Sequence, residues 1–185
     1  PEGTTVLHIG DSMAGALGIE LNRILRDGGV RAVLRFKTAS FIPTWAGTNT
    51  LGIYMARYDP DLTLITLGAN ELKIQDPTIR INAVRKLVSR LEGRPCVWIA
   101  PPLWKAGDTG LLPVIRANCA PCRYMDTNAL VRNMPRVSDK IHPTMAARKV
   151  WARFVVDWLL RQRDPEAERP WELLPASGAP AAGPI

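Results

Sequence analysis

Ser12, Asp139 and His142 have the residue types that nucleophilic catalysis at a carbonyl carbon requires. Ser12 ends the segment Gly10-Asp11-Ser12, and Asp139 precedes His142 by three residues. A serine hydroxyl is a poor nucleophile until a base removes its proton, and His142 is the best candidate for that base. Asp139 can orient the imidazole ring and stabilise its charged form. We therefore expect these three side chains to act together as a catalytic triad.

The negative oxygen of a tetrahedral intermediate needs hydrogen-bond donors that are already in place. The backbone N–H of Ser12 is one candidate, because a helix start presents free N–H groups. The side-chain amide of Asn70 is the second candidate. Each residue alone has an ordinary explanation, Ser12 as a helix cap, Asn70 as a turn residue and His142 as part of a loop. Their combination favours catalysis.

The hydrophobic pattern predicts the elements that carry these residues. Short apolar runs typical of buried strands occur at residues 4–9, 30–36, 62–67, 96–100 and 123–125. Helical patterns lie between them, at residues 17–28, 51–58 and 77–93. The last helix is predicted from an apolar stripe of Ala147, Val150, Trp151, Phe154, Val155, Trp158 and Leu159.

Alternating strands and helices are typical of an α/β fold, here a three-layer α/β/α arrangement with a five-stranded, parallel, doubly wound (flavodoxin-like) sheet. Ligands of such sheets bind at the carboxyl ends of the strands. Ser12 follows the first strand, Asn70 follows the third, and His142 lies between the fifth strand and the last helix. The predicted topology therefore brings them to one edge of the sheet.

Length and composition predict one domain. The chain has 185 residues, 46% of them hydrophobic and 22% charged, which suits a single packed core over residues 1–163. Residues 164–185 are rich in Pro and Ala and predict a largely disordered tail, whose first part Trp171 could anchor. No apolar run approaches the roughly 20 residues that span a membrane. The formal charge of +7 is scattered rather than clustered, so it predicts no nucleic-acid partner.

Three cysteines, Cys96, Cys119 and Cys122, are too few for a disulfide scaffold, and they lack the second pair of ligands that structural zinc needs. We expect no metal and no other cofactor. Cys96 and Cys122 begin neighbouring predicted strands, so an exported protein is expected to join Cys96 to Cys122 or to Cys119. A local bridge between Cys119 and Cys122 is the next choice, and three free thiols in a cytosolic protein stay open. The sequence contains no export signal that would decide the compartment.

Three segments resemble blocks I, III and V of the SGNH (GDSL-like) serine hydrolases: VLHIGDS at 6–12, LGAN at 67–70 and SDKIHP at 138–143. Their order and spacing are similar over about residues 4–160. The resemblance implies that Ser12 is the nucleophile, that Asn70 donates to the oxyanion, and that Asp139 and His142 supply acid and base.

Two positions depart from the pattern of that family. Glu71 follows Asn70 where the family has an aspartate, and we expect little effect because the asparagine carries the chemistry. The stretch Thr38-Ala39-Ser40-Phe41 lacks the glycine whose N–H the family adds to the oxyanion hole. The backbone N–H of Ser40 is our candidate for that donor.

The residues around Ser12 are similar to those of bacterial SGNH enzymes that act on acetylated carbohydrates. They imply a small-molecule or carbohydrate ester as substrate, with a short acyl group such as acetyl. Trp45 and Trp104 are expected to line the cleft as sugar platforms, although packing of either ring in the core is an equal alternative. A thioesterase or lysophospholipase of the same family is the nearest rival function. A catalytically silent domain that binds a ligand is the other.

Overall fold

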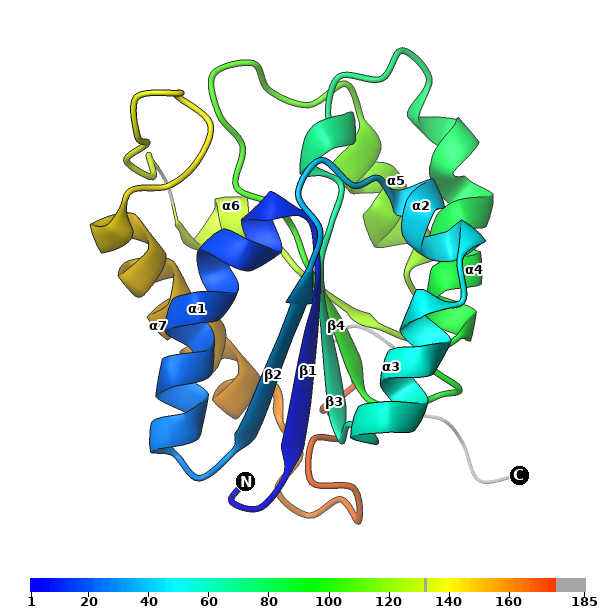
Figure 1. The fold of residues 1–185 in the computed structure, drawn as a ribbon, viewed down its shortest axis with the longest axis vertical. Helices are drawn as coiled ribbons and strands as arrows, with labels where there is room; N and C mark the ends of the chain where they lie inside the picture. The colour runs from blue at the N-terminus through cyan, green and yellow to red at the C-terminus, as the bar shows by residue number, and fades with distance from the viewer. Residues whose placement is uncertain (132, 176–185) are drawn as a thin grey trace.

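Five parallel strands form one sheet in the order β2-β1-β3-β4-β5 in the computed structural model (Figure 1), which describes residues 1–131 and 133–175. The strands are β1 (Thr5–Gly10), β2 (Arg31–Phe36), β3 (Leu62–Thr66), β4 (Cys96–Ile99) and β5 (Arg123–Met125). Val6 of β1 is paired with Ala32 of β2 and with Leu62 of β3. The order of the strands reverses at β1 and β3, which is where doubly wound sheets bind ligands. The predicted sheet is therefore confirmed.

Helices cover both faces of the sheet (Figure 1). One face carries α1 (Ser12–Asp27) and α7 (Met145–Gln162). The other carries α2 (Ile42–Gly47), α3 (Thr50–Tyr58), α4 (Ile81–Ser89) and α5 (Leu111–Asn118), while α6 (Thr127–Leu130) and the 3₁₀ helices η1 (Ala69–Glu71) and η2 (Pro77–Arg80) lie in connections. The hydrophobic pattern does not predict α2, α5 or α6, because helices of 6, 8 and 4 residues are too short to display a repeat.

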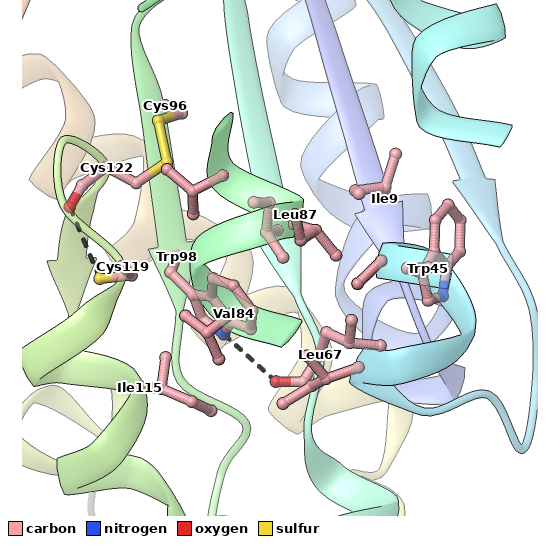
Figure 2. Packing of buried hydrophobic residues seen from close by; sticks show 14 of the residues in the cluster. Ile9, Trp45, Leu67, Val84, Leu87, Cys96, Trp98, Ile115, Cys119 and Cys122 are labelled. Atoms are coloured by element: carbon pink, nitrogen blue, oxygen red, sulfur yellow. Dashed lines mark hydrogen bonds between the residues drawn. A yellow bond between two sulfur atoms is a disulfide. The ribbon is translucent and has the colours of Figure 1, made fainter. Parts of the chain in front are cut away.

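Each face of the sheet has its own hydrophobic core, and the core under α4 and α5 reaches the end of β3. Trp98 of β4 is fully buried beside Val84 and Ile115. Figure 2 shows its indole Nε1 donating a hydrogen bond to the carbonyl of Leu67, at 3.2 Å. Leu67 is the last residue before the turn that carries Asn70. Core packing therefore determines where that turn begins.

The buried face of α7 is narrower than the sequence stripe predicts. Val150 and Phe154 are 46% and 37% exposed, whereas Trp151 and Val155 are fully buried. The apolar stripe that predicts this helix therefore includes two positions, Val150 and Phe154, that are not buried. The buried positions follow a four-residue spacing, which is the ridge that packs against the neighbouring helix α1. Neither α7 nor any other described helix combines the length and apolar content that a membrane crossing needs.

Residues after α7 return to the start of the sheet. Arg163 forms an isolated bridge with Leu173, and Trp171 is buried. The indole Nε1 of Trp171 donates to Thr4 Oγ1 at 2.9 Å, just before β1. Trp171 therefore anchors the first part of the predicted tail. Residues 176–185 lie outside the described residues, and the prediction of disorder for them stays a prediction.

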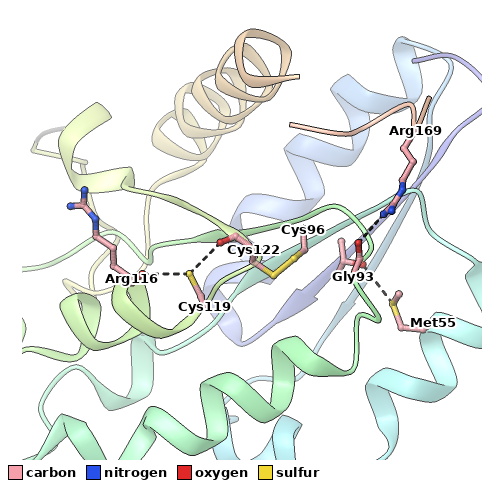
Figure 3. The surroundings of a disulfide bond; sticks show 8 residues. Met55, Gly93, Cys96, Arg116, Cys119, Cys122 and Arg169 are labelled. Atoms are coloured by element: carbon pink, nitrogen blue, oxygen red, sulfur yellow. Dashed lines mark hydrogen bonds between the residues drawn. A yellow bond between two sulfur atoms is a disulfide. The ribbon is translucent and has the colours of Figure 1, made fainter. Parts of the chain in front are cut away.

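A disulfide joins Cys96, at the start of β4, to Cys122, just before β5 (Figure 3). It lies at the amino edge of the sheet, opposite the edge where the strands end. Cys119 is a buried free thiol, and its Sγ lies 3.6 Å from the carbonyl of Cys122. Burial raises the pKa of the Cys119 thiol to about 11, so it is not a reactive thiolate. Of the pairings left open by the sequence, the structure has Cys96–Cys122.

Replacing Cys96 and Cys122 together with serine is expected to lower the melting temperature by roughly 10 °C. The bridge closes a sequence separation of 26 residues, and a loop of that size restricts the unfolded chain by about 3 to 4 kcal/mol. Differential scanning calorimetry measures the shift. Cys119→Ala is the control for loss of a buried sulfur without loss of the bridge, and it should lower the melting temperature clearly less than the double variant. A double variant as stable as the wild type would show that the bridge does not stabilise the fold.

Candidate active site

The three residues predicted as a triad lie within hydrogen-bonding distance of one another. Ser12 is the first residue of α1, directly after the end of β1. Its Oγ lies 2.9 Å from His142 Nε2, and His142 Nδ1 lies 2.6 Å from Asp139 Oδ2. A histidine bonded in this way on both ring nitrogens has one nitrogen available to accept a proton from the serine. The geometry is that of a nucleophile, its base and the group that orients the base.

A tight turn in the loop before α7 presents His142 to Ser12. Asp139 Oδ1 accepts backbone N–H bonds from Ile141 at 2.8 Å and from His142 at 2.9 Å. Lys140 has a left-handed backbone, with φ of 61°, which lets the chain reverse at this point. The side chain of Asp139 therefore both shapes the turn and holds the imidazole.

The carboxyl group of Asp139 is held in its ionised form. The hydrogen bond from His142 is the largest cause, and the two backbone N–H groups add to it, so that the pKa of Asp139 falls to about 2. Hydrogen bonds to the charged form lower a carboxyl pKa in this way. Asp139 can therefore stabilise an imidazolium on His142 throughout the neutral pH range.

Asn70 lies in η1, after the end of β3, and lines the same pocket as Ser12 and His142. Its Nδ2 donates to the carbonyl of Ser40 at 3.0 Å, which leaves the second N–H of that amide for another acceptor. In the described part of the chain, the backbone N–H groups of Ser12 and Ser40 donate to no protein acceptor. Ser12 and Asn70 therefore line one pocket, and Ser40 is joined to it through its bond to Asn70. A role of the Ser40 N–H in the oxyanion hole stays a prediction.

The turn from β1 into α1 depends on Gly10. Its φ is 152°, and a Cβ built on it would lie 1.8 Å from the carbonyl oxygen of Thr66 on β3. Any side chain at this position would push β1 and β3 apart. Glycine therefore lets the two strands stay in contact up to the point where Ser12 and Asn70 emerge.

Asp11, to which the sequence interpretation gives no role, and Glu71, from which it expects little effect, both hold segments of the site together. Asp11 is completely buried, and its Oδ2 accepts N–H bonds from Gly68 at 3.2 Å and Ala69 at 3.1 Å. Its Oδ1 caps α1 by accepting from Met13 N at 2.8 Å. One carboxylate thus joins the turn that carries Ser12 to the turn that carries Asn70. The sequence signal that could have indicated this role is the position of Asp11, an acidic residue directly before Ser12 at the end of an apolar strand.

Glu71 connects the Asn70 turn to the start of α2. Its carboxylate is buried, accepts the backbone N–H of Ile42 at 2.7 Å and forms an ion pair with Arg80. Ile42 follows the segment that includes Ser40. The departure from the family motif at position 71 therefore coincides with a bond between the two segments that supply Asn70 and Ser40.

Burial raises the pKa of Asp11 from 3.8 to about 6. The N–H bonds from Met13, Ala69 and Gly68 act in the opposite direction, and the nearby charge of Glu71 raises the pKa further. A carboxyl whose pKa rises on folding binds its proton more tightly in the folded chain. The free energy of unfolding therefore falls as the pH rises from the unfolded pKa to the folded pKa of this group.

In the Asp11→Asn variant the side chain at position 11 cannot ionise. We therefore expect the free energy of unfolding of this variant to lack the fall with rising pH that Asp11 causes. From about pH 3.5 to about pH 7.5, the unfolding free energy of the variant should rise by about 3 kcal/mol relative to wild type. Urea denaturation at both pH values measures the difference. Asp76→Asn is the control, because a hydrogen bond from Thr78 lowers the pKa of Asp76 and its effect has the opposite sign. A pH-independent difference for Asp11→Asn would contradict the raised pKa.

The pocket beside Ser12 has a volume of about 190 Å³ and includes Trp104, as the sequence predicts. Trp45 does not lie there. It belongs to α2, is buried in the core, and donates through Nε1 to Ser40 Oγ at 3.0 Å. Of the two alternatives expected for Trp45, a place in the cleft and packing in the core, the structure has packing in the core. Trp45 supports Ser40 instead of contacting a ligand in the pocket.

No family model matches the chain, and no curated protein sequence matches it. Its fold is similar to the solved structure of TesA, with a TM-score of 0.69, 22% identity and coverage of 84% of this chain and 97% of that chain. A catalytic mutant of Axe2, an acetylxylan esterase from Geobacillus stearothermophilus, aligns with a TM-score of 0.64, 15% identity and coverage of 84% and 94%. The lipase/acylhydrolase from Enterococcus faecalis aligns with a TM-score of 0.62 and 13% identity, and the alignment covers 89% of this chain and 99% of that chain. At these identities the likeness shows a shared fold, in agreement with the fold that the sequence motifs imply.

Proposed function

We propose, from the fold that the chain shares with SGNH (GDSL-type) hydrolases and from the geometry around Ser12, that it is a serine esterase. The observation that carries the proposal is the continuous contact from Ser12 Oγ through His142 to Asp139, at 2.9 and 2.6 Å. The two segments involved are distant in the chain, because Ser12 and His142 are 130 positions apart. Their meeting at the carboxyl edge of the sheet supports catalysis over accidental proximity.

The first half of the reaction transfers the acyl group to the enzyme. Ser12 Oγ attacks the ester carbonyl carbon while His142 Nε2 takes the hydroxyl proton. The carbonyl oxygen becomes an oxyanion, which the Asn70 amide and the Ser12 N–H stabilise, with Ser40 N–H as the third donor. When the intermediate collapses, the C–O bond to the alcohol breaks. His142 then gives its proton to the leaving oxygen.

The second half releases the acid. Water attacks the acyl carbon of the acyl-enzyme, and His142 Nε2 takes a proton from the water. A second oxyanion forms in the same hole. Its collapse breaks the bond to Ser12 Oγ, and His142 returns the proton to the serine. Asp139 stays ionised and stabilises the imidazolium in both halves.

The pocket size favours a short acyl group. At about 190 Å³ the pocket beside Ser12 lies below the range of about 300 to 1,000 Å³ that is usual for small-molecule sites. An acetyl group fits this space, and the fold likeness to an acetylxylan esterase supports an acetyl ester of a carbohydrate as the substrate.

A fluorophosphonate probe tests for a working nucleophile. We expect it to label Ser12, as mass spectrometry of the modified peptide would show, and we expect no labelling of Ser12→Ala. A folded wild-type protein that resists the probe would be a silent binding domain. A panel of p-nitrophenyl esters should give the highest kcat/KM for acetate, and a maximum at long acyl chains would indicate a thioesterase or lysophospholipase instead.

A further inference from the structure

A second and larger cavity lies next to the pocket of Ser12. Its volume is about 910 Å³, which is in the range of sites that hold small-molecule ligands. Trp104 lines both cavities. The residues that line it include Leu103, Trp104, Lys105, Met134, Arg136 and Lys140. We refer to it as the cationic cavity.

The charges around the two cavities have one sign. Lys105, Arg136 and Lys140 line the cationic cavity, and Lys73 lines the pocket of Ser12. Among the described residues that line either space, none is an aspartate or a glutamate. Within the described part of the chain, none of these four cations has a carboxylate within 4.0 Å. A cleft whose charged lining residues are all cations concentrates anionic ligands.

Arg136 is fixed in place without losing its charge. Its guanidinium donates to the carbonyl oxygens of Ile141 at 2.6 Å, Leu103 at 2.7 Å and Pro102 at 3.3 Å. These bonds connect the loop of His142 to the loop of Trp104. The Asp139 carboxylate, in the same loop as Arg136, is already bonded to His142. Burial lowers the pKa of Arg136, and the charge of Asp139 acts in the opposite direction. In the described part of the chain no carboxylate lies within 4.0 Å of Arg136, which therefore presents a positioned positive charge.

The chemistry of the reaction determines which part of the substrate meets this cavity. His142 gives its proton to the oxygen of the leaving alcohol, so the alcohol portion must lie beside the imidazole. The wall of the cationic cavity includes Arg136 and Lys140, which belong to the loop that presents His142. The oxyanion donors Asn70 and Ser40 come from other segments. The cavity is thus placed for the alcohol portion rather than for the carbonyl oxygen.

We propose that the cationic cavity binds the alcohol portion of the ester, and that this portion is an acidic oligosaccharide whose anionic groups meet Lys105, Arg136 and Lys140. Trp104 supplies the flat apolar surface on which a sugar ring packs. The inference rests on the proposed esterase function, and it adds the charge of the substrate to it.

Binding is measured first, without catalysis, on Ser12→Ala protein by isothermal titration calorimetry. The probes are a trimer of galacturonic acid and its uncharged methyl-ester form. We expect the acidic trimer to bind at least about tenfold more tightly at low salt, and we expect the difference to shrink as salt screens the charges. A sulfated trisaccharide is the second arm, which separates a carboxylate requirement from a general anion requirement. Equal binding of charged and uncharged trimers would overturn the proposal.

Charge variants connect the preference to the cavity. In the Ser12→Ala background, Lys105→Gln with Lys140→Gln should reduce the acidic-to-neutral binding ratio about five- to tenfold. The matching Lys→Arg pair should restore it. Lys86→Gln with Lys149→Gln, at exposed positions of α4 and α7, is the control that removes the same two charges and should leave the ratio unchanged. Equal effects of the control and of the Lys105→Gln and Lys140→Gln pair would show that the net charge, and not the cavity, selects the anion.

Kinetics on the active protein separates this inference from the proposed function. Acetylated galacturonate oligomers should give a higher kcat/KM than acetylated neutral oligomers, and the difference should lie mainly in KM. Hydrolysis of p-nitrophenyl acetate without any preference for the acidic sugar would preserve the esterase and reject the cavity's role. No hydrolysis of any ester, together with tight binding of the acidic trimer, would support the cavity and reject the esterase.

Discussion

Ser12→Ala is expected to lower kcat for p-nitrophenyl acetate by roughly 10³-fold or more. The substitution removes the hydroxyl that bonds to His142 Nε2 at 2.9 Å, and no acyl-enzyme can then form. The remaining rate comes from substrate binding and from the oxyanion donors, which the substitution leaves in place. Steady-state assays with enough protein to detect slow turnover give the number.

The fold of Ser12→Ala must be checked beside its activity. Met13 N and Asp11 form the cap of α1 without the serine side chain, so the melting temperature should stay close to that of wild type. Ser12→Ala with His142→Ala should lose little more than either single variant, because the two residues act as a unit. Near-normal turnover by folded Ser12→Ala would assign the nucleophile to another residue.

Asn70→Ala is expected to lower kcat on the order of 10²-fold, with a small change in KM. The oxyanion exists only in the transition state, so its donor contributes to kcat and not to the binding of the ground state. Stopped or continuous assays over a range of substrate concentrations separate the two constants.

Asn118→Ala is the matched control for this loss. Asn118 also donates through Nδ2 to a backbone carbonyl, that of Val114 at 2.8 Å, but it ends α5 at the amino edge of the sheet. Its kcat should stay near the wild-type value. A raised KM with unchanged kcat in Asn70→Ala would make Asn70 a substrate-binding residue and not an oxyanion donor.

The fold and the hydrogen-bonded arrangement of Ser12, His142 and Asp139 could be predicted because their signals are local. Each strand is one short apolar run, and Ser12 and Asn70 follow the strands that carry them. The position of His142 depends on a short turn, which Asp139 shapes by accepting hydrogen bonds from residues two and three positions along the chain. A local pattern of this kind is visible in the sequence before any contact is known.

The remaining parts of the site depend on contacts between distant residues. Asp11 acts through Gly68 and Ala69, which are 57 and 58 positions away. Trp45 is buried because it lies on the inner face of α2. The sequence does not reveal this face, because the 6 residues of α2 are too few for a hydrophobic repeat. The partner of Cys96 follows from the pairing of β4 with β5, which places Cys122 and not Cys119 within reach. No such contact can be deduced from spacing alone.

The buried Asp11 carboxylate reduces the number of independent movements that can disturb the site. Because it bonds to both turns, Ser12 and Asn70 are displaced together, and their separation is preserved when the sheet edge fluctuates. The turn of Asp139 and His142 is held together by its own bonds and forms a second unit. Misalignment of Ser12 and His142 then depends mainly on how the second unit docks against the first. If the chain is the esterase proposed above, a change far from Ser12 that shifts this docking would lower turnover, and the bonds of Arg136 to the loop of Trp104 are where such a shift would begin.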